Sequence, residues 1–162
     1  MEKKTYIRVT PASIVISVDE VSDGKFSGSY LHVTQNIQKP FGSLVELVLD
    51  LDVLMNDLDM PQAYTERRTW DYPCNYRQRN KPQRIKNKTV TQLLRQGKTA
   101  TFALYIPMRR NSSWQGEVVW VEGKKQVLFR SVLELLHLIY FACNEENYGQ
   151  LGMPKWLLEN GD

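Results

Sequence analysis

The residues with the most distinctive chemistry lie in a basic stretch between positions 63 and 98. Its ten lysines and arginines stand against only two acidic residues, Glu66 and Asp71, so the stretch has a net charge of +8 in a chain whose net charge is +3. The rest of the chain therefore carries −5, and the positive charge is concentrated in one segment. We call residues 63–98 the connector, because they separate two similar parts of the chain.

Aromatic residues are interleaved with these cations, beginning at Tyr64. In proteins that hold a single nucleic-acid strand, cations contact the phosphates and ring faces stack on bases, each stacked base contributing roughly 1 to 3 kcal/mol. The pattern therefore indicates a nucleic-acid partner, either RNA or a single strand. The residues expected to contact phosphates or bases are Arg67, Arg68, Trp70, Tyr72, Tyr76, Arg77, Arg79, Lys81, Arg84, Lys86 and Lys88.

Three other interpretations of the connector stay open. It could lie across the acidic side of the first expected helix and complete the core with its aromatic rings, or it could be a solvated loop, as blocks of like charge usually are. It could also bind a protein with an acidic surface, since arginine, tyrosine and tryptophan dominate interface hot spots. The acidic residues concerned in the first case are Glu46, Asp50, Asp52, Asp57 and Asp59.

Catalytic and metal-binding patterns are weak. His32 and His137 are the only histidines, and His137 lies one helical turn after Glu134, where the two could form a structural pair. The acidic run 50–59 lacks the glycine of a calcium loop, and Cys74 and Cys143 lack metal-binding spacing. No phosphate-loop, dinucleotide-binding or nucleophile-elbow motif occurs. We expect no catalytic residue, no metal and no cofactor.

The two parts of the chain resemble one another when the sequence is shifted by 88 positions. An apolar alternation with period two at 13–18 lies over another at 101–108, which predicts a strand in each part. The residues matched further along are Phe26 with Trp114, Gly28 with Gly116, Val33 with Val121, Gln38 with Gln126, Phe41 with Phe129, Ser43 with Ser131, and Glu46 with Glu134. We interpret this match as an internal duplication.

Each part predicts three strands followed by a helix. Gly28 and Gly116 suit a bulge or a close approach of backbone, and Pro40 favours an edge position for the strand at 38–41. The sequences SLVE and SVLE are capping boxes at the start of the two helices. The second helix has little polar face, so it is either covered on both sides or presents an apolar surface to a partner.

The fold class predicted is α+β, with two pseudo-symmetric β-β-β-α repeats, each an antiparallel sheet covered by a helix, joined by the basic connector. The first unit is residues 1–62, the connector 63–98 and the second unit 99–162. A three-stranded sheet with one helix is marginal alone, so we expect the two units to pack as one globular domain.

The run from Asn111 to Ile139 resembles a small domain of Clostridia-type bacteria, whose pattern is N-x-[ST]-W-Q-G-x-V-x-W followed by F-R-S-x-L-E-L-x-x-L-I. The resemblance covers about the last third of the chain, with a fainter echo in the first third. It implies the fold unit and a bacterial origin, and it implies no activity.

Composition sets the remaining expectations. With 162 residues, 42% hydrophobic and 24% charged, the chain has the composition of a globular protein. It contains no apolar run long enough for a signal peptide or a membrane span, which predicts a cytoplasmic protein, monomeric or homodimeric. The function predicted is non-catalytic binding of nucleic acid. The alternative is a protein-interaction module, an adaptor or inhibitor that a mobile element could encode, docking on an acidic surface or through its second helix.

Overall fold

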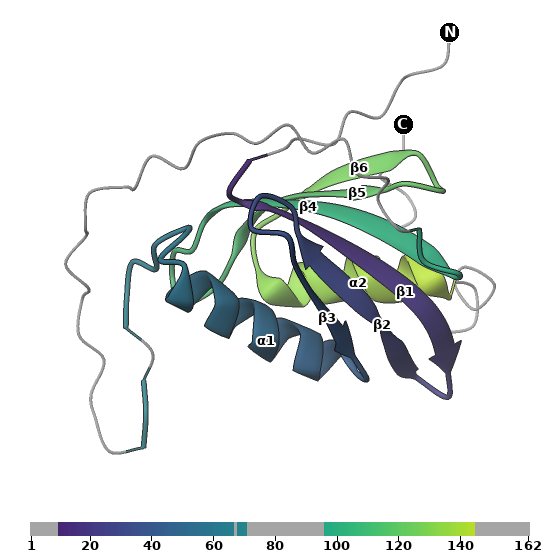
Figure 1. The fold of residues 1–162 in the computed structure, drawn as a ribbon, viewed down its shortest axis with the longest axis horizontal. Coiled ribbons are helices and arrows are strands. Elements are labelled where there is room, and N and C mark those ends of the chain that lie inside the picture. The colour runs from purple at the N-terminus through teal and green to yellow at the C-terminus, as the bar shows by residue number, and fades with distance from the viewer. Residues whose placement is uncertain (1–9, 67, 71–95, 145–162) are drawn as a thin grey trace, which may run out of the picture.

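A computed structural model describes residues 10–66, 68–70 and 96–144 of the chain. Three strands and a helix precede the connector, and three strands and a helix follow it (Figure 1). The elements are β1 (Ser13–Ser22), β2 (Lys25–His32), β3 (Ile37–Phe41), α1 (Leu44–Asp57), β4 (Ala100–Met108), β5 (Gln115–Trp120), β6 (Lys125–Phe129) and α2 (Val132–Cys143).

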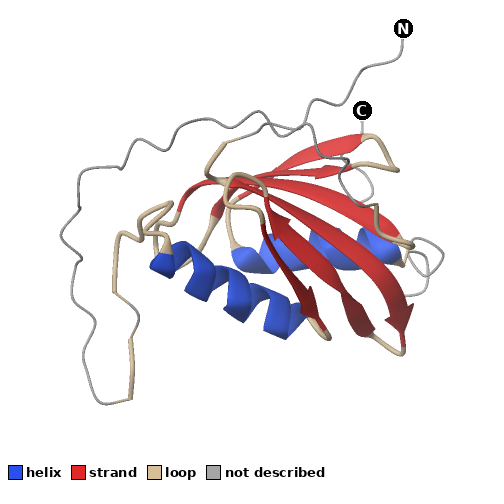
Figure 2. Cartoon of the chain, viewed as in Figure 1, coloured by secondary structure: helices blue, strands red, loops and turns tan. Residues whose placement is uncertain are grey.

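All six strands belong to one antiparallel sheet with the order β3-β2-β1-β4-β5-β6. Both helices cover the same face of this sheet, and their buried residues share one hydrophobic core with it (Figure 2). The α+β class is confirmed. The structure differs from the prediction in having one continuous sheet in place of two, because β1 and β4 pair from Ser13 with Tyr105 to Val18 with Ala100.

The edges of the sheet are the two short strands. β3 contains Pro40, which lacks the N–H that a central strand would donate to a neighbour, and it lies at one edge as predicted. β6 forms the other edge, and its Leu128 is 75% exposed.

A serine begins each helix as the capping boxes predicted. The Oγ of Ser43 accepts from the N–H of Glu46 at 3.1 Å, and the Oγ of Ser131 accepts from the N–H of Glu134 at 3.2 Å. The glutamates reach one residue further back than expected. Their Oε2 atoms accept from the N–H groups of Gly42 and Arg130, each at 2.7 Å, so the N–H satisfied is that of the residue before the cap.

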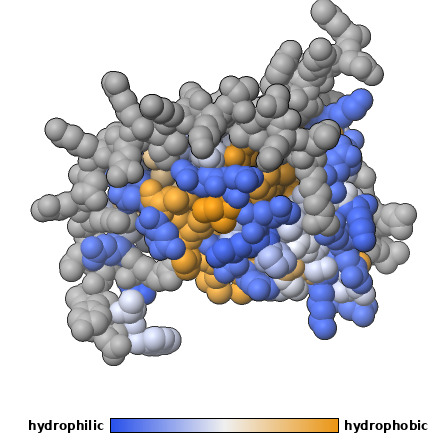
Figure 3. Space-filling model, in the orientation of Figure 1, coloured by the Kyte–Doolittle hydropathy of each residue, from blue (hydrophilic) through white to orange (hydrophobic). Residues whose placement is uncertain are grey.

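Helix α1 has apolar residues on two opposite sides. Its inner side buries Leu47 and Leu51. On the outer side Val45, Leu49 and Val53, four residues apart, are 67%, 57% and 47% exposed. On the face of the molecule drawn in Figure 3, hydrophobic surface lies beside hydrophilic surface. The sequence analysis did not single out this outer stripe.

Helix α2 is less deeply covered than its composition suggests. Only Leu135 and Ile139 are buried in it, while Leu133 is 63% exposed. Of the two expected arrangements for this helix, the structure shows the one that leaves apolar side chains accessible.

Two glycines allow neighbouring backbones to approach. A Cβ on Gly28 would lie 2.0 Å from the carbonyl oxygen of Ser17, and a Cβ on Gly116 would lie 2.0 Å from that of Tyr105. The strand pairing shifts by a residue beside each glycine, between Val18 and Glu20 in β1 and between Tyr105 and Met108 in β4. Both parts of the prediction for these glycines, bulge and close approach, are confirmed.

Replacing either glycine by alanine should lower the free energy of unfolding by about 2 kcal/mol or more, because the new methyl group meets backbone that cannot move alone. Urea denaturation of Gly116→Ala and Gly28→Ala measures this. The control is Gly42→Ala, whose Cβ would lie 3.4 Å from a flexible glutamate oxygen and should cost less than about 0.5 kcal/mol. Equal losses in all three variants would contradict the steric explanation.

Candidate functional site

Two of the predicted binding residues lie in the described part of the connector. Arg68 and Trp70 are both exposed, and the side chain of Trp70 is 104% exposed relative to its reference. A fully accessible indole is available for stacking. The other predicted residues, Arg67, Tyr72, Tyr76, Arg77, Arg79, Lys81, Arg84, Lys86 and Lys88, lie outside the described residues.

The start of the connector is fixed to the loop that follows β4. Ala63 forms a parallel bridge with Arg109, and the N–H of Tyr64 donates to the carbonyl oxygen of Arg109 at 3.1 Å. The hydroxyls of Thr65 and Ser112 share a hydrogen bond of 3.0 Å. The guanidinium of Arg110 lies 5.0 Å from the centroid of the Tyr64 ring, in cation–π geometry. Residues 63–65 thus lie along the second unit.

The end of the connector is fixed at the other end of β4. The N–H of Thr99 donates to the carbonyl oxygen of Val18 at 2.9 Å, and the Thr99 hydroxyl donates to that of Asp19 at 2.9 Å. The N–H of Lys98 donates to Oδ1 of Asp19 at 3.3 Å. Since β4 has nine residues, the two fixed ends are about 30 Å apart along the sheet.

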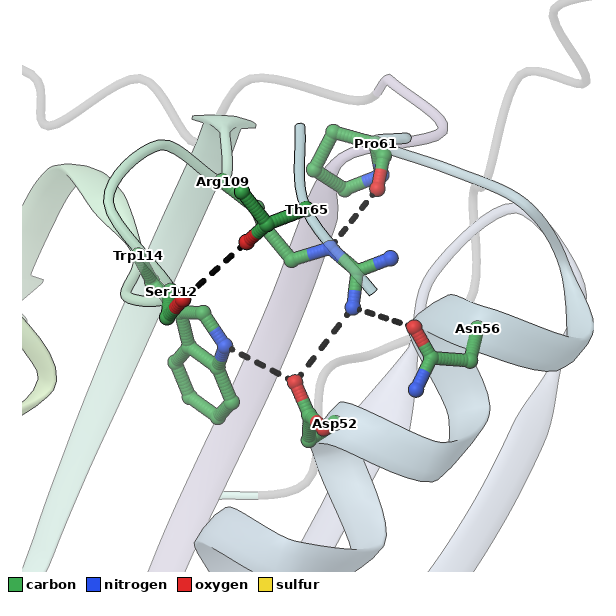
Figure 4. Close-up of polar contacts among 7 residues, drawn as sticks. All are labelled: Asp52, Asn56, Pro61, Thr65, Arg109, Ser112 and Trp114. Atoms are coloured by element: carbon green, nitrogen blue, oxygen red, sulfur yellow. Dashed lines mark hydrogen bonds and ion pairs between the residues drawn. The ribbon is translucent and has the colours of Figure 1, made fainter. Parts of the chain in front are cut away.

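A buried arginine holds the start of the connector in place (Figure 4). Arg109 is only 3% exposed, and its Nε donates to the carbonyl oxygen of Pro61 at 2.8 Å. Its Nη1 donates to Oδ1 of Asn56 at 2.7 Å and to Oδ1 of Asp52 at 3.3 Å, both on α1. The side chain of Arg109, in the second unit, therefore forms hydrogen bonds both to α1 of the first unit and to Pro61 in the segment that follows α1.

The carboxylate of Asp52 supplies the negative charge that a buried guanidinium requires. It is 27% exposed and also accepts from the indole N–H of Trp114 at 3.3 Å. Trp114 is 3% exposed, so it lies in the core. This cluster was not predicted from the sequence, where Asp52 was placed on the acidic side of a helix and Arg109 was not a candidate. The available signal was the pair Arg109 and Arg110 directly after an apolar strand.

A small hollow of about 110 Å³ lies beside this cluster, lined by residues that include Thr65, Glu66 and Ser112. Arg109 donates to a carboxylate and an amide on α1 and to the carbonyl of Pro61, so the chemistry of the cluster is that of a clamp between segments. It positions the connector.

The two histidines have different surroundings. His32 is 1% exposed, its Nε2 lies 3.0 Å from the carbonyl oxygen of Pro11, and its Nδ1 accepts from the N–H of Gln35 at 3.4 Å. A carbonyl only accepts, so the neutral ring with its proton on Nε2 satisfies both contacts. Burial lowers the pKa of His32, more than its backbone hydrogen bonds raise it.

The expected pairing of His137 with Glu134 is replaced by another. Both carboxylate oxygens of Glu134 accept from Arg130, Oε1 from its Nη2 at 2.7 Å and Oε2 from its backbone N–H. The side-chain hydrogen bond from Arg130 lowers the pKa of Glu134. His137 is exposed, with its ring 5.9 Å from that of Phe141. Glu134 pairs with Arg130 because the capping position of its carboxylate brings it to the turn before the helix.

Three further findings concern the described residues only. They contain no group of three histidine, cysteine or acidic side chains that could hold a metal ion. Their cysteine, Cys143, is a free thiol. None of their helices has the length and hydropathy needed to cross a bilayer.

Comparison with known proteins gives no relative: no family model, curated protein or solved structure matches this chain.

Removing the charge of Arg109 should destabilise the protein. Arg109→Met keeps the aliphatic stem but leaves three acceptors on α1 and Pro61 without their donor, so the free energy of unfolding should fall by roughly 2 to 4 kcal/mol. Urea denaturation measures the change. The matched control is Arg110→Met, an exposed neighbour, which should cost less than about 1 kcal/mol. Similar losses in the two variants would show that Arg109 is no clamp.

The lowered pKa of His32 should make stability depend on pH. The unfolded state takes up a proton near pH 6.5, while the folded ring resists it, so the contribution of His32 is full above about pH 6.5 and is lost as pH falls below that value. The stability advantage of the wild type over His32→Gln should therefore shrink between pH 7.5 and pH 5 in urea denaturation. A constant difference over this range would disprove the linkage.

Proposed function

We propose that this protein is a non-catalytic binding protein that holds RNA or a single nucleic-acid strand along its connector. The observation that carries the proposal is the charge of +8 in a segment whose two described ends are fixed about 30 Å apart, at opposite ends of β4. The distance between the two fixed ends is one that several nucleotides can span.

The charge of the folded units supports this role for the connector. The first unit, residues 1–62, contains nine acidic residues against five basic ones. A phosphate backbone would be repelled by that unit and attracted by the connector, so the charge distribution favours one binding surface over the rest.

The described residues of the connector support stacking as well as charge. Arg68 and Trp70 project into solvent only a few residues after the anchored positions 63–65. An exposed aromatic ring beside an arginine is the combination that single-strand binding uses for stacking and charge.

We also propose that the two units are repeats related by duplication. The strand pairings support this interpretation: Ile14 pairs with His32 as Phe102 pairs with Trp120, 88 positions on, and Tyr30 pairs with Lys39 as Val118 pairs with Val127. The bulges at Gly28 and Gly116 and the serine caps follow the same interval.

A second candidate function is protein docking, which the outer stripe of α1 favours. Val45, Leu49 and Val53 lie opposite the buried side of the helix, and acidic residues flank them at Glu46 and Asp57. An apolar stripe with an acidic border suits a partner segment that is apolar and basic.

The deciding experiment is a fluorescence-anisotropy titration of labelled mixed-sequence single-stranded RNA and DNA at 50 and 200 mM salt. The affinity of the wild type should fall at least tenfold over this range, because binding releases several counterions. The variant with Arg77, Arg79, Arg84 and Lys86 changed to alanine should lose binding.

The matched control removes four exposed cations outside the connector, Lys25, Lys39, Lys124 and Arg130, and should keep at least half of the binding energy. Equal weakening by the two sets would assign binding to overall charge. An absence of binding at micromolar protein would reject the nucleic-acid function and leave protein docking as the candidate.

A further inference from the structure

The second unit contains a cavity that the proposed function does not use. It has a volume of about 470 Å³ and lies between the sheet and the second half of α2. Its apolar walls include Phe102, Val118, Phe141 and Ala142. The volume is within the range of about 300 to 1,000 Å³ that is typical of small-molecule sites, and an apolar lining with few polar groups is also typical of them.

Two of the side chains that line the cavity are smaller than their counterparts in the first unit. At the positions 88 residues earlier, Val118 corresponds to Tyr30 and Ala142 to Leu54, which are 1% and 7% exposed. The register is the same, since Tyr30 pairs with Lys39 and Val118 with Val127. At these two positions the second unit lacks a phenol ring and part of an isobutyl group, although Phe102 is larger than its counterpart Ile14.

The second unit also differs from the first in having a cation at the opening of the cavity. Lys125, which lines the cavity and is exposed, stands where the first unit has the partly buried Ile37. Its ammonium group lies 5.4 Å from the centroid of the Trp120 ring, which also lines the cavity. Lys125 and Val127, which is 42% exposed, mark the side on which the cavity meets solvent.

Trp120 contributes its ring to the same wall, while its indole Nε1 is buried away from the surface. The cavity thus combines an apolar interior with a cation at its opening.

We propose that this cavity binds a small apolar monocarboxylate, of which a medium-chain fatty acid is the simplest member. The acyl chain occupies the space left by the missing ring and isobutyl group, and the carboxylate meets Lys125 at the opening. A larger anion such as a nucleotide does not fit this site, because its walls offer apolar contacts and its charge is confined to the rim.

The test is isothermal titration calorimetry of the full chain with sodium decanoate, below the concentration at which it forms micelles. The wild type should bind one equivalent saturably. Lys125→Glu should weaken binding at least tenfold, whereas the matched control Lys124→Glu, an exposed neighbour that does not line the cavity, should change it less than twofold.

A second pair of measurements tests the shape of the site. Ala142→Leu restores the side chain of the first unit and should abolish binding while the protein stays folded in a thermal melt. Decanol should bind wild type and Lys125→Glu equally, since it carries no charge. The variant with four connector residues changed to alanine should bind decanoate like the wild type, which separates this inference from the nucleic-acid function.

The inference fails if decanoate shows no saturable binding to the wild type. It also fails if Lys124→Glu weakens binding as much as Lys125→Glu, or if the folded Ala142→Leu variant binds decanoate like the wild type. Each of these results would show that the cavity is packing space and no binding site.

Discussion

The pairing of β1 with β4 is the interaction on which the rest of the structure depends. Each unit alone is a three-stranded sheet with one helix, and a unit of this size is marginal by itself. By joining along β1 and β4, from Ser13 with Tyr105 to Val18 with Ala100, the units turn two exposed edges into the centre of one sheet. The same pairing places the ends of the connector, since both are fixed to residues beside these strands.

The two units have similar backbone arrangements and differ in the side chains that these carry. Pairing registers, bulges and helix caps recur at an interval of 88 residues. The side chains differ between the units: the first unit is acidic and buries Tyr30, whose pKa burial raises to about 12, while Val118 at the corresponding position lines a cavity. Backbone geometry is held by hydrogen bonds that tolerate many side chains, so volume and charge can change while the strands keep their partners.

The local features of the fold could be predicted from sequence because they depend on short intervals. The alternation of apolar residues predicted the strands, and the serines of the capping boxes predicted where the helices begin. Gly28 and Gly116 predicted the bulges. The long-range features could not be predicted. The hydrogen bond from Arg109 to Asp52 joins residues 57 positions apart. The pairing of β1 with β4 leaves no periodic signal in the sequence. The outer stripe of α1 could not be predicted, because the exposure of Val45, Leu49 and Val53 depends on whether another segment covers the side opposite the buried leucines. Most of the predicted binding residues fall outside the described residues, so that part of the site stays a prediction.

The unequal edges of the sheet limit how copies of this protein can associate. Pro40 in β3 has no N–H to offer a further strand, whereas β6 contains no proline between Lys125 and Phe129. A further strand would therefore find fewer donors at β3 than at β6. Growth of a sheet from copy to copy needs both edges of each copy, so this difference favours a closed pair through β6 over a fibre.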